Sequence, residues 1–297
     1  MKRPLVYLML VLAISFWGCS FILTKEVFAA DSNISATLLV AMRLAVATAI
    51  LIPLLAAQHK LEPIRRGDIK WFLLLVFAEP FIYHFCEASA VRYVSSSLAS
   101  LIVATIPLFV PFGMYIFYHQ PLRTPVIIGI FMSFIGIGIT LIGGESLSGS
   151  LNGFIFLGLA VFIAVVYMLV LTKIVDHYRP VTITAYQNLI GLAYYLPVVL
   201  AVDAPKLPLI HFSPYILVLI FLLGACCSAI AYIFYNYGIR HLGTSQASAF
   251  YNASPAVSLI AAVAIGQESF SWAKLIGIAV VISGVVIAQR QTGQTTQ

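Results

Sequence analysis

One mostly apolar segment of the chain carries several side chains whose types and spacing could do chemistry. Glu79, Tyr83 and Glu87 are spaced four residues apart, which places them along one face of a helix. His84 lies three residues before Glu87, close enough for the two side chains to touch. Pro80 removes a backbone hydrogen bond, so we expect a kink beside Glu79. Carboxylates and an imidazole buried in this arrangement could bind a polar solute or carry a proton.

Arg43 lies in a separate apolar segment and is the natural partner of one carboxylate, because an ion pair lowers the cost of burying both charges. Two interpretations remain open. In one, Arg43 and a glutamate form a structural ion pair away from any ligand. In the other, Arg43 or Glu79 faces a cavity, where a carboxylate binds solute or carries a proton. Two carboxylates face one arginine, so we assign proton coupling to Glu79 and Glu87, with Glu79 as the main candidate.

A second set of polar and aromatic residues is spread over the other apolar segments. An amide inside a membrane must find a hydrogen-bond partner, whereas a tyrosine can also be an interfacial or packed core residue. Carboxylates on one side, with Tyr, Asn and Trp on the other, would suit a polar or aromatic organic solute. The predicted substrate-binding residues are Trp17, Arg43, Tyr83, His84, Asn188, Tyr232, Asn236 and Asn252. Further polar candidates are Tyr167, Tyr186, Gln187, Tyr235 and Tyr251.

The composition indicates which elements must position these residues. Hydrophobic residues make up 62% of the 297 residues and charged residues only 9%, whereas a soluble domain carries roughly 25% charged residues. A soluble globular domain is therefore excluded. Because a spanning helix needs roughly 20 apolar residues, the sequence predicts an all-α membrane protein with ten transmembrane helices. These lie near residues 5–24, 35–56, 70–91, 97–118, 124–143, 151–172, 182–202, 214–238, 245–266 and 272–289.

Lys and Arg residues are divided unevenly between the two sets of loops. Eleven of the sixteen lie in one set and four in the other, while Arg43 lies within a span. Cytoplasmic loops are enriched in these residues, so we expect both termini in the cytoplasm, as an even number of spans also requires. The expected location is a bacterial-type inner (plasma) membrane. The net charge of +6 is then a topology signal and not a nucleic-acid-binding patch.

The two halves of the sequence repeat each other at a constant offset of 148 residues. Four matches of distinctive residue types are Arg92 with Arg240, Pro107 with Pro255, Gly129 with Gly277 and Gly136 with Gly284. Each half holds five spans, an odd number, so the second copy must be inverted in the membrane. We therefore predict two inverted five-helix repeats, residues 1–148 and 149–297. Such repeats are typical of carriers that work by alternating access.

Short motifs also recur in a fixed order along the chain. They are Trp17-Gly18 with Lys25, Arg43, the block 90–107, its copy 237–255, and Glu268 with Gly277 and Gly284. In order and spacing, these motifs resemble the EamA-type transporters of the drug/metabolite transporter superfamily, over nearly the whole chain. The first half departs from the family at Gln120, where a glutamate is usual. The resemblance implies a ten-helix fold, with exporters of amino acids and other metabolites as common members.

Residues and resemblance together predict a secondary transporter for an amino acid or related metabolite, with export as the expected direction. The alternatives are an uncoupled facilitator or channel for small solutes, and an intramembrane enzyme. The sequence has no HExxH motif, no Ser/His pair for nucleophilic catalysis and no filter-like loop. No cofactor or metal is expected. The expected partners are a small solute and the lipid bilayer but no nucleic acid, and the chain is expected to be a monomer or weak homodimer.

Overall fold

The structure, a computed structural model, describes residues 3–119, 124–142, 151–242, 247 and 250–290. Every regular element in this part of the chain is helical. The first half comprises α1 (Arg3–Ala30), α2 (Ala36–Ala57), η1 (Arg66–Asp68), α3 (Ile69–Val76), η2 (Phe77–Ile82), α4 (Tyr83–Ala90), α5 (Ser96–Val103), α6 (Ile106–Tyr118) and α7 (Thr124–Ile142). The second half comprises α8 (Leu151–Ile174), α9 (Pro180–Val198), η3 (Val199–Asp203), η4 (Ala204–Leu209), α10 (Pro214–Leu222), η5 (Leu223–Ile230), α11 (Ala231–Leu242), η6 (Phe250–Ala253), α13 (Ser254–Ala264) and α14 (Trp272–Arg290).

The helices agree closely with the predicted spans. Seven helical segments of the described residues are long and apolar enough to cross a membrane, and three shorter apolar helices cover 127–141, 250–264 and 272–287. The chain is therefore a multi-pass membrane protein, while the count of ten spans stays a prediction. Helix α1 runs to Ala30, several residues beyond its predicted end. The predicted boundary between the halves, at residue 148, and the departure at Gln120 lie outside the described residues.

Two of the long helical segments and one of the shorter apolar helices are interrupted, each near a proline. Between α3 and α4, Glu79 has an extended backbone (φ −143°, ψ 118°), and Pro80 follows it. The break between α5 and α6 lies just before Pro107, and that between η6 and α13 just before Pro255. Proline has no N–H and its ring crowds the preceding turn, so it starts a helix readily but interrupts one. The predicted kink beside Glu79 is thus confirmed, in the form of a complete break.

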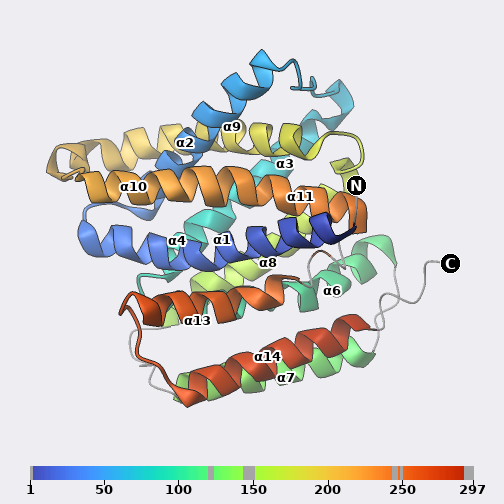
Figure 1. Cartoon of the computed structure of the whole chain (residues 1–297). Coiled ribbons are helices and arrows are strands. Elements are labelled where there is room, and N and C mark those ends of the chain that lie inside the picture. The colour runs from blue at the N-terminus through green and yellow to red at the C-terminus, as the bar shows by residue number, and fades with distance from the viewer. Residues whose placement is uncertain (1–2, 120–123, 143–150, 243–246, 248–249, 291–297) are drawn as a thin grey trace.

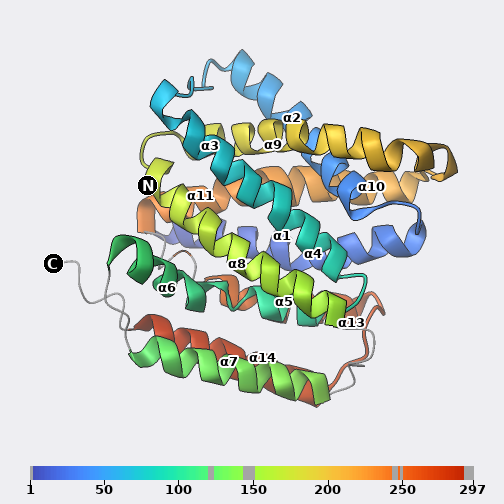
Figure 2. The ribbon, with the colours of Figure 1, turned by 180° about the vertical axis from the view of Figure 1, so that it is seen from behind.

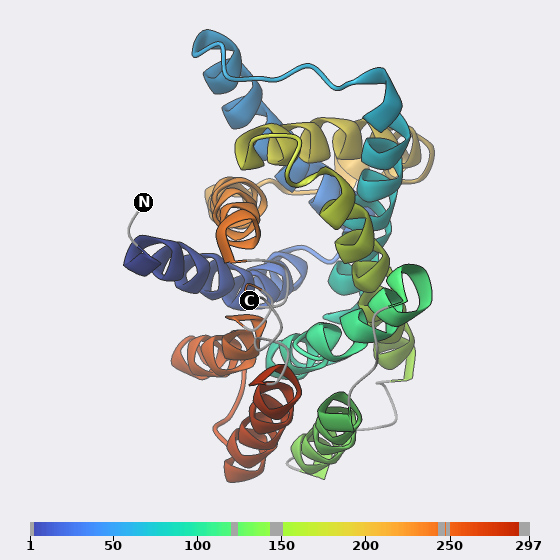
Figure 3. The same ribbon diagram turned by 90° about the vertical axis from the view of Figure 1, so that its right-hand side faces the viewer.

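Helices α1, α9, α10 and α11 run roughly along one direction, and α2, α3–α4 and α8 cross them at a slant (Figures 1 and 2). Helix α1 packs against α11 and α13, and α8 packs against α4 and α6. Helices α7 and α14 form a separate pair along one edge of the bundle. The view in Figure 3, along the bundle, shows this pair below α5 and α13. The start of α1 and the end of α14 lie at the same end of the bundle.

Helices α7 and α14 approach each other through glycines. A Cβ atom on Gly277 would lie 2.1 Å from Thr140 Oγ1 and 2.5 Å from the carbonyl oxygen of Gly136. A Cβ atom on Gly284 would lie 2.8 Å from the carbonyl oxygen of Gly129. Small residues let helix backbones come this close in a membrane. The glycines that matched at the 148-residue offset are therefore packing residues, and they meet crosswise: Gly136 faces Gly277, and Gly129 faces Gly284.

Candidate functional site

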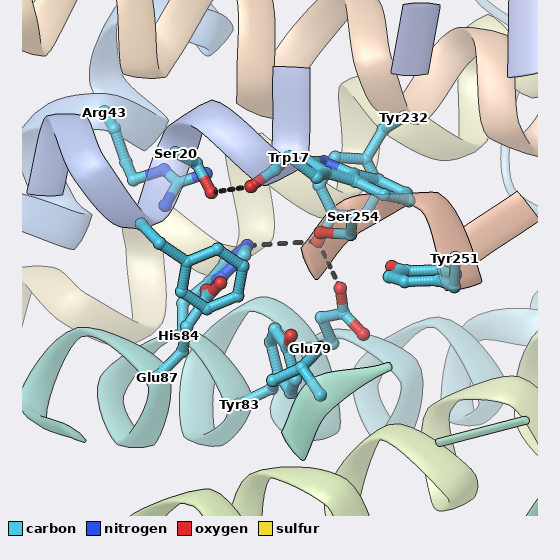
Figure 4. Close-up of a pocket in the computed structure, with 12 residues that line it drawn as sticks. Trp17, Ser20, Arg43, Glu79, Tyr83, His84, Glu87, Tyr232, Tyr251 and Ser254 are labelled. Carbon is cyan, nitrogen blue, oxygen red and sulfur yellow. Dashed lines mark hydrogen bonds and ion pairs between the residues drawn. The ribbon is translucent and has the colours of Figure 1, made fainter. Parts of the chain in front are cut away.

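A narrow polar pocket lies where α1, α2, α4 and α11 meet the helix breaks at Glu79 and Ser254 (Figure 4). Its lining residues are Trp17, Ser20, Phe21, Arg43, Glu79, Tyr83, His84, Glu87, Val103, Tyr232, Tyr251 and Ser254. The cavity that they enclose measures only about 10 Å³, room for about one water molecule. Seven of the ten residues predicted for substrate binding or proton coupling are among the twelve.

Glu79 reaches the pocket because the helix is broken at its position. The side chain is only 4% exposed, and the Tyr232 hydroxyl lies within hydrogen-bonding distance of Glu79 Oε1. The predicted single helical face does not exist at this residue, since its backbone is extended. Glu79, Tyr83 and Glu87 nevertheless line one pocket. The spacing therefore grouped residues that line one pocket, although the shared helical face begins only at Tyr83.

Hydrogen bonds connect Glu79 to Glu87 through two other side chains. Tyr232 contacts Glu79 on one side, and its hydroxyl lies 3.1 Å from His84 Nε2 on the other. His84 Nδ1 lies 2.8 Å from Glu87 Oε2, which confirms the predicted contact between these two residues. Figure 4 shows Glu79, Tyr232 and His84 joined in one line. All four side chains are buried, so the chain of hydrogen bonds is shielded from bulk solvent.

The expected ion pair between Arg43 and a glutamate is not formed. Arg43 Nε donates to Ser228 Oγ at 2.8 Å, and within the described residues no ion pair joins the guanidinium to Glu79 or Glu87. Arg43 is instead hydrogen-bonded to Ser228, and each carboxylate has another partner, Glu79 in Tyr232 and Glu87 in His84. Arg43 still lines the pocket and is 3% exposed. Its charge therefore faces the same small volume as both glutamates.

An aromatic cluster closes the pocket on the side of α11 and η6. The Trp17 ring lies 4.9 Å from those of Tyr232 and Tyr235 and stacks on Tyr251 at 5.1 Å, measured between centroids. Trp17 Nε1 donates to the backbone oxygen of Cys227 at 3.0 Å. The indole is thus held in one orientation at the wall of the pocket.

The three predicted asparagines do not line the pocket. Asn188 Nδ2 donates to the backbone oxygens of Thr184 and Ser228, and Asn236 Nδ2 donates to the Thr184 hydroxyl. Asn188 does line a smaller adjoining cavity that also contacts His84 and Tyr232. In the part of the chain that the structure describes, Oδ1 of Asn188, Asn236 and Asn252 has no hydrogen-bond partner. Buried acceptors without partners are costly, so they mark where water or a solute would be stabilised.

Four lining residues were not predicted: Ser20, Phe21, Val103 and Ser254. Ser20 lies one helical turn after Trp17, and its hydroxyl donates to the backbone oxygen of Trp17 at 2.7 Å. Helical spacing from Trp17 could have identified Ser20. Ser254 was not predicted because a serine beside Pro255 in an apolar segment does not by itself indicate a site; it lies at the junction of η6 and α13, where it lines the pocket.

A second polar group, the Glu268 network, joins the ends of several helices at the end of the bundle opposite to Arg3. Its members are Glu26, Ser96, Ser97, Gln267, Glu268 and Lys274. Glu268 accepts hydrogen bonds from the backbone N–H and hydroxyl of Ser97 and lies 2.8 Å from Lys274 Nζ. Burial raises the pKa of Glu268, but the hydrogen bonds from Lys274 and Ser97 outweigh it and leave the pKa below its usual value. The carboxylate is therefore ionised where it bridges α5 and α14.

Comparison with known proteins agrees with this architecture. The sequence profile of the EamA-like transporter family matches twice, over residues 4–142 and 151–289. An uncharacterized transporter of Archaeoglobus fulgidus is 24% identical over 96% of this chain and 99% of its own length. The uncharacterized transporter YyaM of Bacillus subtilis is 25% identical over 97% of this chain and 94% of its own. A solved crystal structure, 18% identical, superposes over 99% of this chain and 100% of its own with a TM-score of 0.72, a likeness of fold alone.

A multi-pass helical bundle with a buried, charged site at a helix break is the construction of a membrane transporter. Because both halves match one family profile, the assignment does not depend on the site alone. The chain belongs to the EamA-like transporter family.

Proposed function

We propose that this protein is a secondary transporter that moves an amino acid or a related small metabolite, as an exporter, across a bacterial-type plasma membrane. The observation that carries the proposal is the composition of the pocket. Glu79 and Glu87 offer acceptors for an ammonium group, and Arg43 offers a donor for a carboxylate. The ring of Trp17 supplies an aromatic surface for the rest of the solute. A small zwitterion fits this pattern of charges.

Proton coupling through Glu79 is supported by the hydrogen bonds that lead from it to Glu87. If the Tyr232 hydroxyl donates to Glu79, its oxygen accepts from His84 Nε2, and the remaining proton lies between His84 Nδ1 and Glu87. If Glu79 is protonated instead, it donates to Tyr232, the hydroxyl donates to Nε2, and Nδ1–H donates to Glu87. Both arrangements contain three protons on the same heavy atoms. One mobile proton can therefore be held at either end of this hydrogen-bond chain.

Alternating access between two inverted halves, residues 1–148 and 149–297, is supported by contacts that repeat at the 148-residue offset. The pairs Gly136–Gly277 and Gly129–Gly284 exchange places under this offset, as a two-fold relation requires. His84 and Tyr232, themselves 148 residues apart, contact each other. We infer ten spans, with both termini cytoplasmic, and a monomer or weak homodimer. Two such halves can tilt against each other around a central site.

The small volume of the pocket indicates that the structure has a conformation closed to the solute. A volume of about 10 Å³ does not admit an amino acid. The Glu268 network ties α1, α5 and α14 together at one end of the bundle. With both termini cytoplasmic, this end is the outer one. We infer that the network closes the outer entrance and that solute release requires it to part.

Counterflow into proteoliposomes tests the function. Vesicles preloaded with one amino acid at high concentration are given a trace of the same labelled amino acid outside, and each common amino acid is tested in turn. The proposal expects transient, saturable accumulation for at least one of them in wild type and its loss in Trp17→Ala. Phe77→Ala, which removes a ring exposed on the outside of the bundle, is the matched control and keeps the signal. Absence of counterflow for every amino acid, or non-saturable flux typical of a channel, would overturn the proposal.

A further inference from the structure

A large apolar groove lies apart from the polar pocket, between α6, α7 and α8. Its volume is about 630 Å³, against about 10 Å³ for the polar pocket. Along α8 it reaches from Gly158 to Leu169, which is roughly 16 Å at about 1.5 Å per residue. The hydrocarbon core of a bilayer is about 30 Å thick. The groove therefore extends over about half of the membrane.

The wall of the groove offers almost nothing to a polar ligand. Apart from two hydroxyl residues, its lining consists of aliphatic residues, phenylalanines and glycines. The Thr105 hydroxyl already donates to the backbone oxygen of Ile102 at 2.6 Å. Ser133 is only 2% exposed, so its single hydroxyl is the most that the wall offers to a polar group. An occupant must consequently be apolar over its whole bound length.

The groove is continuous with the surface that faces the bilayer. Phe117, Phe134 and Phe162 belong to its lining, one from each of its three helices, and each is more than 60% exposed. Such large exposed side chains on a membrane-spanning helix contact lipid chains. The molecules that reach this opening first, and at the highest concentration, are therefore membrane lipids.

We propose that the groove is a binding site for one acyl chain of a membrane phospholipid. The chain lies lengthwise between α6 and α8, in contact with α7. The leaflet follows from the helix directions, because Phe117 lies at the end of α6, on the side of the bundle where α1 begins. With the orientation proposed above, this is the cytoplasmic leaflet. The site is separate from the polar pocket, so its existence does not depend on which solute is transported.

Replacing a glycine that lines the groove can fill the groove without disturbing its walls. Gly158 lines the groove, and a Cβ atom there would meet nothing within 4 Å. Gly158→Leu therefore occupies the groove while leaving the backbone in place. Gly138, on α7, has the same free space around a Cβ atom but does not line the groove. Gly138→Leu is the matched control.

Photolabelling tests the proposal on the full chain. The protein is reconstituted in phosphatidylethanolamine vesicles that contain a phosphatidylglycerol with a diazirine in the middle of one acyl chain. After irradiation, labelled peptides are mapped by mass spectrometry, with α10 as the reference surface because Leu217, Val218 and Phe221 are exposed on it. We expect labelling concentrated on α6, α7 and α8 in wild type and in Gly138→Leu. Gly158→Leu should lower it by about fivefold, which corresponds to about 1 kcal/mol of binding free energy, with α10 labelling unchanged.

Two results would overturn the proposal. One is labelling of α6–α8 no greater than that of α10, which would mean ordinary lipid contact. The other is equal labelling of Gly158→Leu and wild type. A loss of α10 labelling in Gly158→Leu would reveal misfolding of that variant. Gly158→Ala, which fills less of the groove, should then give an intermediate decrease in labelling of α6–α8. Labelling of α6–α8 in Gly158→Ala equal to that of wild type would contradict the proposal. Because the readout is lipid labelling, each of these results is distinguishable from a failure of solute counterflow.

Discussion

Tyr232 stands in the middle of the hydrogen-bond chain between Glu79 and His84, and its ring packs on Trp17. These two roles can be separated by Tyr232→Phe, which keeps the ring and removes the hydroxyl. The link between the two carboxylates is then interrupted while the aromatic cluster remains. We expect uphill transport driven by a pH gradient to fall by about a hundredfold, the smaller end of what a positioned proton-transfer group contributes. Counterflow, which needs no net proton movement, should persist.

The measurement is initial uptake rate in proteoliposomes, with and without a pH gradient. Tyr195→Phe is the control, since Tyr195 is also buried but its hydroxyl donates to the backbone oxygen of Phe81, outside the pocket. If Tyr232→Phe keeps its full gradient-driven rate, the hydroxyl does not connect the two carboxylates in transport.

Seven of the twelve residues that line the pocket were predicted from the sequence to bind substrate or couple protons, but the partners of Arg43 and Glu79 were not. Ionisable groups in apolar segments are costly enough to stand out, which is how Glu79, Glu87 and Arg43 were recognised. Their pairing was predicted wrongly, because the partners of Arg43 and Glu79 come from the second half of the chain, Ser228 and Tyr232. Such contacts depend on how the halves pack, which residue spacing within one helix does not encode.

Among the contacts between helices and loops, those of Glu268 predict that the stability of the protein depends on pH. Its pKa is lowered in the folded protein because the hydrogen bonds from Lys274 and Ser97 outweigh burial. The stabilisation from the ionised carboxylate is therefore present above its unfolded pKa of about 4.3 and is lost as the pH falls through the folded pKa. We expect Glu268→Gln to unfold at a lower temperature than wild type at neutral pH, with a difference that shrinks in acid below that range.

Thermal unfolding of both proteins in detergent, at neutral pH and in acid, gives this comparison. Glu62→Gln is the control, because Glu62 is partly exposed and pairs at 3.7 Å with the half-exposed Arg179, where a surface ion pair contributes about 1 kcal/mol or less. A difference between Glu268→Gln and wild type that is the same at both pH values contradicts the role assigned to the carboxylate.

The pair formed by α7 and α14 gives a second prediction at this scale. In Gly277→Ala, the added methyl group would lie within 2.5 Å of Thr140 Oγ1 and the backbone of Gly136. The helices must move apart, and overpacking of this kind costs about 1–3 kcal/mol. Gly138→Ala meets nothing within 4 Å and should be neutral. The unfolding midpoint should fall for Gly277→Ala alone; equal midpoints for the two variants would rule out close packing at Gly277.

The helices themselves could be predicted well from apolar runs, since most boundaries fall within a few residues of those observed. The interruptions could be predicted only in part. Pro80 indicated the break beside Glu79, whereas the extended backbone at Glu79 was not foreseen. Pro107 and Pro255 are the second residues of the helices that follow their breaks, and proline is also tolerated in the first turn of ordinary helices. A proline therefore indicates that a helix is interrupted but does not define the geometry of the interruption.

For the molecule as a whole, the 148-residue offset was the most informative pattern. It related Gly129 and Gly136 to Gly277 and Gly284, which meet in the structure, and His84 to Tyr232, which form one hydrogen bond. The contacts of the Glu268 network could not be predicted, because Ser97 and Glu268 are 171 residues apart. Contacts of this kind are specific to one conformation, whereas a sequence must encode all the conformations of a transport cycle.

We propose that Glu79 carries the proton that drives solute movement through this pocket. The most direct test is Glu79→Gln, with gradient-driven uptake and counterflow measured on the same proteoliposomes. Glutamine keeps the size and the hydrogen-bond acceptor for Tyr232 but cannot exchange a proton at this position. We predict that gradient-driven uptake is lost while counterflow of the same solute continues. Gradient-driven uptake that persists at the wild-type rate in Glu79→Gln would contradict the claim.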